Sequence, residues 1–150
     1  MYPAPFRYHR AASIEAAIRQ LSELGEGARA LAGGQSLLVW LKMRFGEVSD
    51  LVDIGRIPGL DTITQDAAGV RIGALATHAR IARSPLAKLL PIVGDCANGI
   101  ADNQVRSRGT IGGSLASGDP SCDWPVLLTT LDAKLHTQGP GGTRDLPVDG

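Results

Sequence analysis

The stretch Arg29-Ala30-Leu31-Ala32-Gly33-Gly34-Gln35-Ser36-Leu37 decides how the first third of this chain folds. Residues 29–32 predict a short buried strand that runs into a glycine pair, and residues 36–44 predict a helix or one long turn. A further strand is predicted over 48–54. This order of elements predicts a βαβ-like unit, with the glycine turn at the carboxyl end of a strand, where ligands commonly bind in such units.

A second glycine pair lies far along the chain, in Thr110-Ile111-Gly112-Gly113-Ser114. Adjacent glycines let backbone N–H groups approach an anion closely, because no Cβ is in the way and φ can be positive. Neither signature matches the P-loop or the G-x-G-x-x-G fingerprint, and each alone is explained as well by an ordinary turn. Together they favour a phosphate site, with hydroxyl and amide donors on Gly33, Gly34, Gln35, Ser36, Thr110, Gly112, Gly113 and Ser114.

The rest of the chain predicts short helices and strands around these signatures. Ser13 and Gly25 are expected to cap and end a helix over 14–24. Strands are predicted over 60–64, 70–74 and 133–137, and helices over 77–84, 85–97 and 125–131, with Pro91 interrupting the second helix. Residues 139–150 form a glycine- and proline-rich tail. The predicted fold class is α+β, with a small βαβ subdomain over 1–55 and a mixed or antiparallel sheet-and-helix subdomain over 56–150.

Charge and composition argue against several classes of function. The 150 residues include 15 basic and 15 acidic side chains, so net charge gives no reason to expect binding to nucleic acid or to an anionic membrane. The longest apolar runs are too short to span a bilayer, and residues 1–6 lack the pattern of a secretory signal. Cys96 and Cys122 form no C-x-x-C pair and are expected to be reduced thiols of a cytoplasmic protein.

The sequence contains no pattern for metal binding or acid–base catalysis. The three histidines, His9, His78 and His136, show no metal-ligand spacing, and surface or capping roles are expected for them. Neither a Ser/His/Asp nor a Cys/His set is suggested, so the prediction includes no catalytic residue and no metal ligand.

Three motifs in order give the chain a family resemblance. They are Ala32-Gly33-Gly34-Gln35-Ser36-Leu37, Arg106-Ser107-Arg108-Gly109-Thr110-Ile111-Gly112-Gly113-Ser114 and Asp119-Pro120-Ser121-Cys122-Asp123-Trp124-Pro125. With them, the whole chain resembles the FAD-binding medium subunit, or middle domain, of molybdenum hydroxylases such as xanthine dehydrogenase and carbon monoxide dehydrogenase. The resemblance implies a PCMH-type FAD-binding fold and FAD as the cofactor.

The resemblance also implies a role for each residue of the cofactor site. Residues 32–36 and 110–114 would wrap the FAD pyrophosphate, Asp123 would form a hydrogen bond to the ribityl or phosphate region, and Ile100 would pack against the flavin. Asp123 is also a plausible helix N-cap, and Ile100 is also explained as plain core. Ser114 replaces the family's commoner Asn, and Gln35 replaces His while keeping a donor. The assigned residues are Ala32, Gly33, Gly34, Gln35, Ser36, Leu37, Ile100, Thr110, Ile111, Gly112, Gly113, Ser114 and Asp123.

The implied function is electron transfer within a larger enzyme. A molybdopterin-binding large subunit would oxidise the substrate, a 2Fe-2S small subunit would relay electrons, and FAD would pass them to an external acceptor, in a heterotrimer or its dimer. Arg106 and Arg108 are expected to be solvated or docked on a partner subunit. Family members are nearly twice as long, so this chain is expected to match their N-terminal half to two-thirds. The alternatives are a flavin-free docking subunit and an unrelated nucleotide-binding enzyme.

Overall fold

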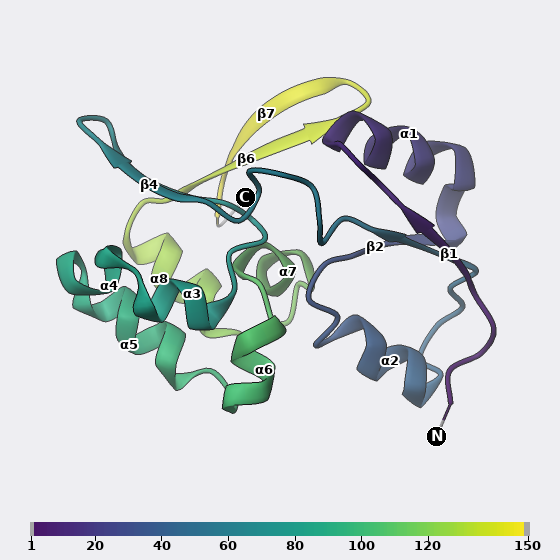
Figure 1. Cartoon of the computed structure of the whole chain (residues 1–150), viewed down its shortest axis with the longest axis horizontal. Helices are drawn as coiled ribbons and strands as arrows, with labels where there is room; N and C mark the ends of the chain where they lie inside the picture. The colour runs from purple at the N-terminus through teal and green to yellow at the C-terminus, as the bar shows by residue number, and fades with distance from the viewer. Residues whose placement is uncertain (1, 149–150) are drawn as a thin grey trace.

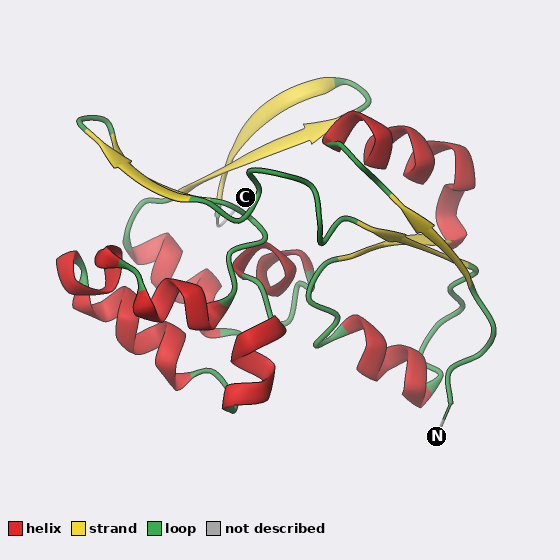
Figure 2. Ribbon diagram, in the orientation of Figure 1, coloured by secondary structure: helices red, strands yellow, loops and turns green. Residues whose placement is uncertain are grey.

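The N-terminal part of the chain builds a small parallel sheet between two helices (Figures 1 and 2). A computed structural model describes residues 2–148. The strands lie in the order β1-β3-β2, and the outer two are both parallel to β3. In Figure 1, α1 lies above this sheet and α2 lies below it. The elements are β1 (Arg7–Arg10), α1 (Ile14–Leu24), the 3-10 turn η1 (Gly25–Gly27), β2 (Ala28–Leu31), α2 (Leu37–Met43) and β3 (Asp50–Asp53).

The limits of α1 are those that the sequence predicts. The Ser13 hydroxyl accepts a hydrogen bond from the Ala16 N–H at 3.2 Å, and Gly25 ends the helix with a φ of 71°. Ala17 is buried against Val52 of the central strand. The predicted cap and stop are confirmed because both depend on residues adjacent in sequence.

A buried carboxylate ties β1 to β3. The Asp50 side chain is 0% exposed and accepts two hydrogen bonds from Arg7, at 2.8 and 2.7 Å. His9 Nε2 lies 2.7 Å from the same carboxylate, and the Ser49 hydroxyl donates to it at 2.7 Å. His9 therefore has a specific partner, in contrast to the surface or capping role expected for it.

Between residues 56 and 148, the second part of the chain contains six short helices and two separate β-hairpins (Figure 2). Both hairpins are antiparallel, as expected for this part, but they do not join into one sheet. The helices are α3 (His78–Arg83), α4 (Pro85–Leu89), α5 (Pro91–Gly99), α6 (Asn103–Arg108), α7 (Ile111–Ala116) and α8 (Asp123–Thr130). The hairpins are β4 (Ile63–Asp66) with β5 (Gly69–Ile72) and β6 (Lys134–Gly139) with β7 (Gly142–Pro147).

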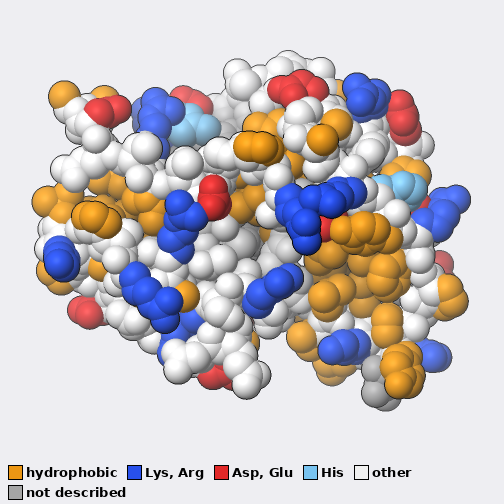
Figure 3. Space-filling model, viewed as in Figure 1, with side chains coloured by type: hydrophobic (Ala, Val, Ile, Leu, Met, Phe, Trp, Pro, Cys, Tyr) orange, Lys and Arg blue, Asp and Glu red, His pale blue; other side chains and the backbone are white. Residues whose placement is uncertain are grey.

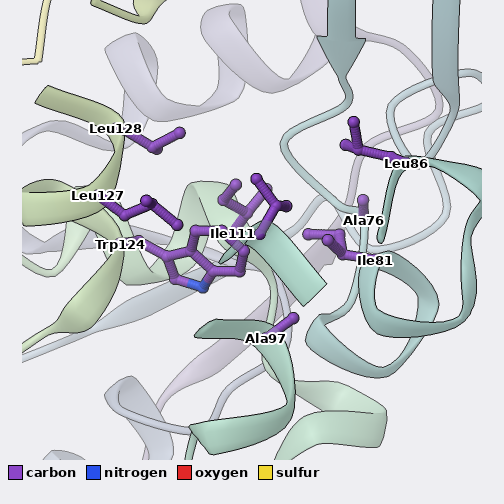
Figure 4. Close-up of a cluster of buried hydrophobic side chains, with 9 residues drawn as sticks. Ala76, Ile81, Leu86, Ala97, Ile111, Trp124, Leu127 and Leu128 are labelled. Carbon is purple, nitrogen blue, oxygen red and sulfur yellow. The ribbon is translucent and has the colours of Figure 1, made fainter. Parts of the chain in front are cut away.

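The larger hydrophobic core lies among these helices (Figure 4). Its members come from most elements of the second part, and Trp124, at 0% exposure, is its largest fully buried side chain. A smaller cluster, centred on Ala11, Ala17, Val52 and Ile57, lies under α1. These two clusters support a division of the chain into 1–55 and 56–150, which we propose, although Ile57 and Leu60 pack with the smaller, N-terminal cluster.

Three expectations about local structure are wrong. The tail from Gly139 contains β7, because Pro140-Gly141 forms a tight turn that pairs Gly139 with Gly142. The second glycine pair lies inside the first turn of α7 instead of in a loop. Asp123 is the first residue of α8, and Cys122 holds the N-cap position.

Candidate functional site

The first signature forms the loop between β2 and α2. Gly34 has a φ of 74°, which glycine adopts readily. The backbone N–H groups of Gly33, Gly34, Gln35 and Ser36 donate to no acceptor within residues 2–148. The side chains of Gln35 and Ser36 are exposed, Ala32 is half-buried, and Leu37 begins α2. This loop therefore presents a row of unused donors, as the sequence predicts for an anion site.

The second signature begins with a buried helix cap. Thr110 is 6% exposed, and its hydroxyl oxygen accepts from the Gly113 N–H at 3.2 Å. The Ser114 N–H donates to the Thr110 carbonyl at 3.0 Å. The hydroxyl hydrogens of Thr110 and Ser114 have no acceptor within residues 2–148, so both remain available to a ligand.

Two further amides of this signature bind α7 to residues 74–76, the segment that leads into α3. The N–H of Ile111 donates to the Ala76 carbonyl at 3.1 Å, and that of Gly112 donates to the Ala74 carbonyl at 2.9 Å. A Cβ on Gly112 would lie 2.6 Å from the Ala74 Cβ, so only glycine allows this approach. The amides of Gly112 and Gly113 are thus engaged within the protein, contrary to the expectation that they donate to phosphate.

The first signature contacts the two residues that lead into the second signature. A Cβ placed on Gly33 would lie 2.1 Å from the Arg108 carbonyl oxygen and 3.0 Å from the Gly109 Cα. Glycine at position 33 is therefore required by contact with the residues that precede the second signature. Beside this contact lies a hollow of about 300 Å³, whose lining includes Ala32, Gly33, Asp53, Arg56, Arg108 and Thr110.

The charged side chains that line the hollow are two arginines and one aspartate. Arg56 and Arg108 line it, and Figure 3 shows Lys and Arg side chains across the middle of this face. The one carboxylate in the lining, Asp53, accepts from the Tyr8 hydroxyl and, at 2.8 Å, from the Gly55 N–H. The hydrogen bond to Asp53 raises the pKa of Tyr8. Two guanidinium groups beside a row of N–H donors suit a ligand with two negative charges.

The third motif lies on a neighbouring segment. Asp119 accepts from the Ser121 hydroxyl at 2.7 Å and from its N–H at 2.9 Å, and these bonds lower the pKa of Asp119. Asp123 is exposed at the start of α8. Burial, with a smaller contribution from the charge of Asp123, raises the pKa of Cys96 to about 11. The role of Asp123 toward a cofactor stays a prediction.

The loop after α5 is held by Arg106. Its guanidinium donates to the carbonyls of Ile100 and Ala101, at 2.6 and 2.8 Å, and to Asn103 Oδ1 at 2.8 Å. These bonds stabilise a turn in which Ala101 has a φ of 41°. Arg106 therefore acts within the chain, in contrast to the solvated or partner-docked role expected for it. Ile100 is half-buried and packs against the larger core, and its contact with a flavin stays a prediction.

His78 is the residue of this region that sequence reasoning missed. It is 4% exposed, and its Nδ1 accepts a hydrogen bond from Trp124 Nε1 at 3.1 Å. Its backbone N–H donates to the Gly109 carbonyl at 3.0 Å. Burial, followed by the charge of Arg106, lowers the pKa of His78 from its ordinary value of 6.5. The only local signal is the Thr77 cap before it, which the sequence predicts and the structure confirms.

The described residues also lack the features of a metal site and of a membrane-spanning helix. Within residues 2–148, no group of three or more His, Cys, Asp or Glu side chains is arranged to hold a metal ion. The helices of the same residues include none that is long and apolar enough to cross a membrane.

A parallel βαβ unit, a helical unit and two neighbouring glycine signatures beside a hollow with two arginines are typical of a domain that binds a dinucleotide. Comparison with known families narrows this class. The family described as the FAD binding domain in molybdopterin dehydrogenase matches residues 4–150. The chain therefore belongs to this family, which confirms the resemblance inferred from the three motifs and assigns FAD as the cofactor.

Individual relatives agree with this assignment. The chain is 42% identical over 151 residues to the carbon monoxide dehydrogenase medium chain of Hydrogenophaga pseudoflava, covering all of this chain and 53% of the relative. It is 44% identical over 149 residues to the 6-hydroxypseudooxynicotine dehydrogenase complex subunit alpha of Paenarthrobacter nicotinovorans, covering 99% and 50%. The chain thus spans about half the length of the relatives that it matches, and these relatives are subunits of oxidoreductases.

Solved structures support the α+β fold. The structure of carbon monoxide dehydrogenase from Hydrogenophaga pseudoflava superimposes with a TM-score of 0.97 at 43% identity, over the whole chain and 53% of the other. Quinoline 2-oxidoreductase from Pseudomonas putida 86 gives a TM-score of 0.94 at 37% identity, over 99% of this chain and 52% of the other. At these identities the likeness extends beyond a shared fold to a shared family.

Proposed function

We propose that this chain binds the pyrophosphate of FAD between its two glycine signatures, as part of the medium subunit of a molybdenum-containing hydroxylase. The observation that carries the proposal is the direct packing of Gly33 on the Arg108 carbonyl, next to the unused N–H groups of residues 33–36. Gly33 and Thr110, one residue from each signature, line the hollow together with Arg56 and Arg108. We call residues 33–36 and 110–114 together the pyrophosphate clamp.

The residues present suit the cofactor. The first loop supplies backbone donors that no protein acceptor within residues 2–148 occupies, and Ser36 adds a hydroxyl. The second signature supplies the Thr110 hydroxyl hydrogen and a helix start whose own amides are already bonded. We infer that Gly112 and Gly113 contribute through their size and that the donors come mainly from the first loop.

The chain's contribution to catalysis is to bind and orient. When bound, FAD supplies the electron-transfer chemistry, and we propose that it passes electrons from 2Fe-2S centres to an external acceptor. Arg56 and Arg108 offset the negative charge of the pyrophosphate. Ile100 and Asp123 are proposed to contact the flavin and its ribityl or phosphate region. No acid or base on this chain is assigned to the reaction.

We propose that the partners are a molybdopterin-binding large subunit and a 2Fe-2S small subunit, in a heterotrimer or its dimer. This proposal is supported by relatives that are themselves named medium chains of carbon monoxide dehydrogenases. Exposed apolar side chains on and after α2 offer surface for protein contacts, and they are Val39, Trp40, Met43 and Phe45. The free thiols of Cys96 and Cys122 suit the cytoplasm, which we propose as the compartment.

Cofactor titration tests the proposal. The purified chain is mixed with FAD, FMN or ADP, and bound flavin is followed by absorbance and fluorescence after gel filtration. We expect about one FAD per chain, competition by ADP, and binding of FMN weaker by roughly 100-fold, because FMN lacks the pyrophosphate. Equal affinity for FMN would contradict the clamp. Failure to bind any flavin, with capture of the large and small subunits intact, would instead favour a docking subunit.

A further inference from the structure

The imidazole of His78 lies between the third motif and the second glycine signature. Trp124, from the third motif, donates its indole N–H to His78 Nδ1 at 3.1 Å. The two ring centroids are 6.0 Å apart and the ring planes differ by 26°. On the other side, a Cβ placed on Gly109 would come within 2.9 Å of both Cδ2 and Nε2 of His78. The ring therefore packs directly on the Gly109 backbone.

The same contacts continue to the first signature. The Gly109 carbonyl accepts a hydrogen bond from the backbone N–H of His78 at 3.0 Å, and the Gly109 N–H donates to the Val105 carbonyl at 2.6 Å. The Arg108–Gly109 backbone is in turn the surface on which Gly33 packs. A continuous path of contacts thus runs from Trp124 through His78 and Gly109 to Gly33. It joins three motifs that are separated by up to 91 positions in the sequence (124 − 33).

We propose that His78 is a positioning residue for FAD binding, which sets the spacing of the pyrophosphate clamp by fixing Gly109 against Gly33. The proposal rests on the proposed function of the clamp. His78 itself lies behind the second signature, and it acts through the backbone that it supports.

A histidine is required here for a specific reason. The Trp124 side chain is 0% exposed, so without an acceptor its indole N–H would be buried and unpaired. Nδ1 can accept only in the neutral ring, whose proton then lies on Nε2, the nitrogen next to Gly109. Burial and the charge of Arg106 lower the pKa of His78, which favours this neutral form at pH 7. An apolar side chain of similar size would fill the space but lose the acceptor.

Three variants of the full chain separate positioning from simple packing. In His78→Leu the acceptor is removed and much of the volume is kept. In His78→Asn, Oδ1 replaces Nδ1 as the acceptor. Leu86→Ala is the matched control, because Leu86 is a buried core residue of α4 that is not part of this path of contacts. Each variant is titrated with FAD well below its own midpoint of thermal unfolding.

We expect His78→Leu to weaken FAD binding about tenfold, since a lost buried hydrogen bond has an effect of that order. His78→Asn should recover most of this loss, while Leu86→Ala should bind FAD as the wild type does. The indole ¹H–¹⁵N signal of Trp124, observed alone in a Trp40→Phe background, should move in the Leu variant and stay near its wild-type position in the Asn variant.

Two results would overturn the proposal. One is a folded His78→Leu variant with wild-type FAD affinity. The other is a loss in Leu86→Ala, at matched thermal stability, as large as that in His78→Leu. If the wild type itself binds no FAD, the proposed function fails and the positioning role fails with it. Wild-type binding with an unaffected Leu variant rejects the positioning role alone.

Discussion

Replacing Gly33 with alanine is expected to lower the affinity for FAD by about 100-fold. The new Cβ would lie 2.1 Å from the Arg108 carbonyl oxygen and 2.9 Å from its carbon, and both are backbone atoms that cannot rotate away. The first signature and the Arg108–Gly109 backbone must then move apart, and forced overpacking of this kind costs roughly 1–3 kcal/mol. Titration of the variant with FAD, followed by flavin fluorescence, measures the effect.

Gly139→Ala is the matched control for this change. A Cβ at Gly139 meets nothing within 4 Å, and its φ is not in the left-handed region, so FAD affinity should stay at the wild-type value. Gly113→Val should have a smaller effect than Gly33→Ala, because the only close neighbour of its Cβ is the Thr110 hydroxyl oxygen at 2.8 Å. Wild-type affinity in Gly33→Ala would show that FAD binds without this contact.

Asp50→Asn is expected to lower the midpoint of thermal unfolding at pH 7 by about 10 °C, because it removes a buried negative charge that the Arg7 guanidinium contacts with two hydrogen bonds. Hydrogen bonds from Arg7, then from His9 and Ser49, hold the pKa of the Asp50 carboxyl well below its ordinary value of 3.8. Because the pKa of Asp50 is lower in the folded than in the unfolded chain, its ionised carboxylate stabilises the fold at any pH above the pKa of the unfolded chain. That stability is lost as the pH falls below about 4.

The acid branch of the stability curve tests this explanation. The midpoint of thermal unfolding of the wild type should fall steadily below pH 4. The midpoint of Asp50→Asn should depend less on pH over the same range. Asp95→Asn is the control, since Asp95 is exposed on α5 and should change neither the midpoint nor its pH dependence appreciably. Identical behaviour of the two variants would mean that the Asp50 network contributes nothing specific to stability.

The sequence predicts best those features that depend on neighbouring residues. Ser13 and Thr77 cap their helices as expected, because a cap needs only a hydroxyl and the amide three positions later. The glycine loop after β2 also lies at the carboxyl end of a parallel strand, as the βαβ order implies. The three motifs likewise indicate the correct family, because each of them is a continuous run of residues.

Features that depend on distant contacts are missed or misplaced by sequence reasoning. The sequence predicts a turn at Gly112, but its lack of a Cβ serves the packing of α7 on Ala74, which is 38 positions earlier (112 − 74). The strand β1 is not among the predicted strands, because its polar residues Arg7 and His9 find their partner only in Asp50, 43 and 41 positions away. His78 has no local signal of burial, since its acceptor role is set by Trp124, 46 residues away.

We propose that residues 33–36 supply the backbone donors for the FAD pyrophosphate, while the second signature holds these residues in place. An NMR titration of the ¹⁵N-labelled chain with FAD tests this division at each amide. We predict large downfield proton shifts for the amides of Gly33, Gly34, Gln35 and Ser36, which have no acceptor within residues 2–148. The amides of Gly112 and Gly113, already bonded within the protein, should shift much less. Unmoved signals at 33–36 in a chain that binds FAD would contradict the proposed clamp.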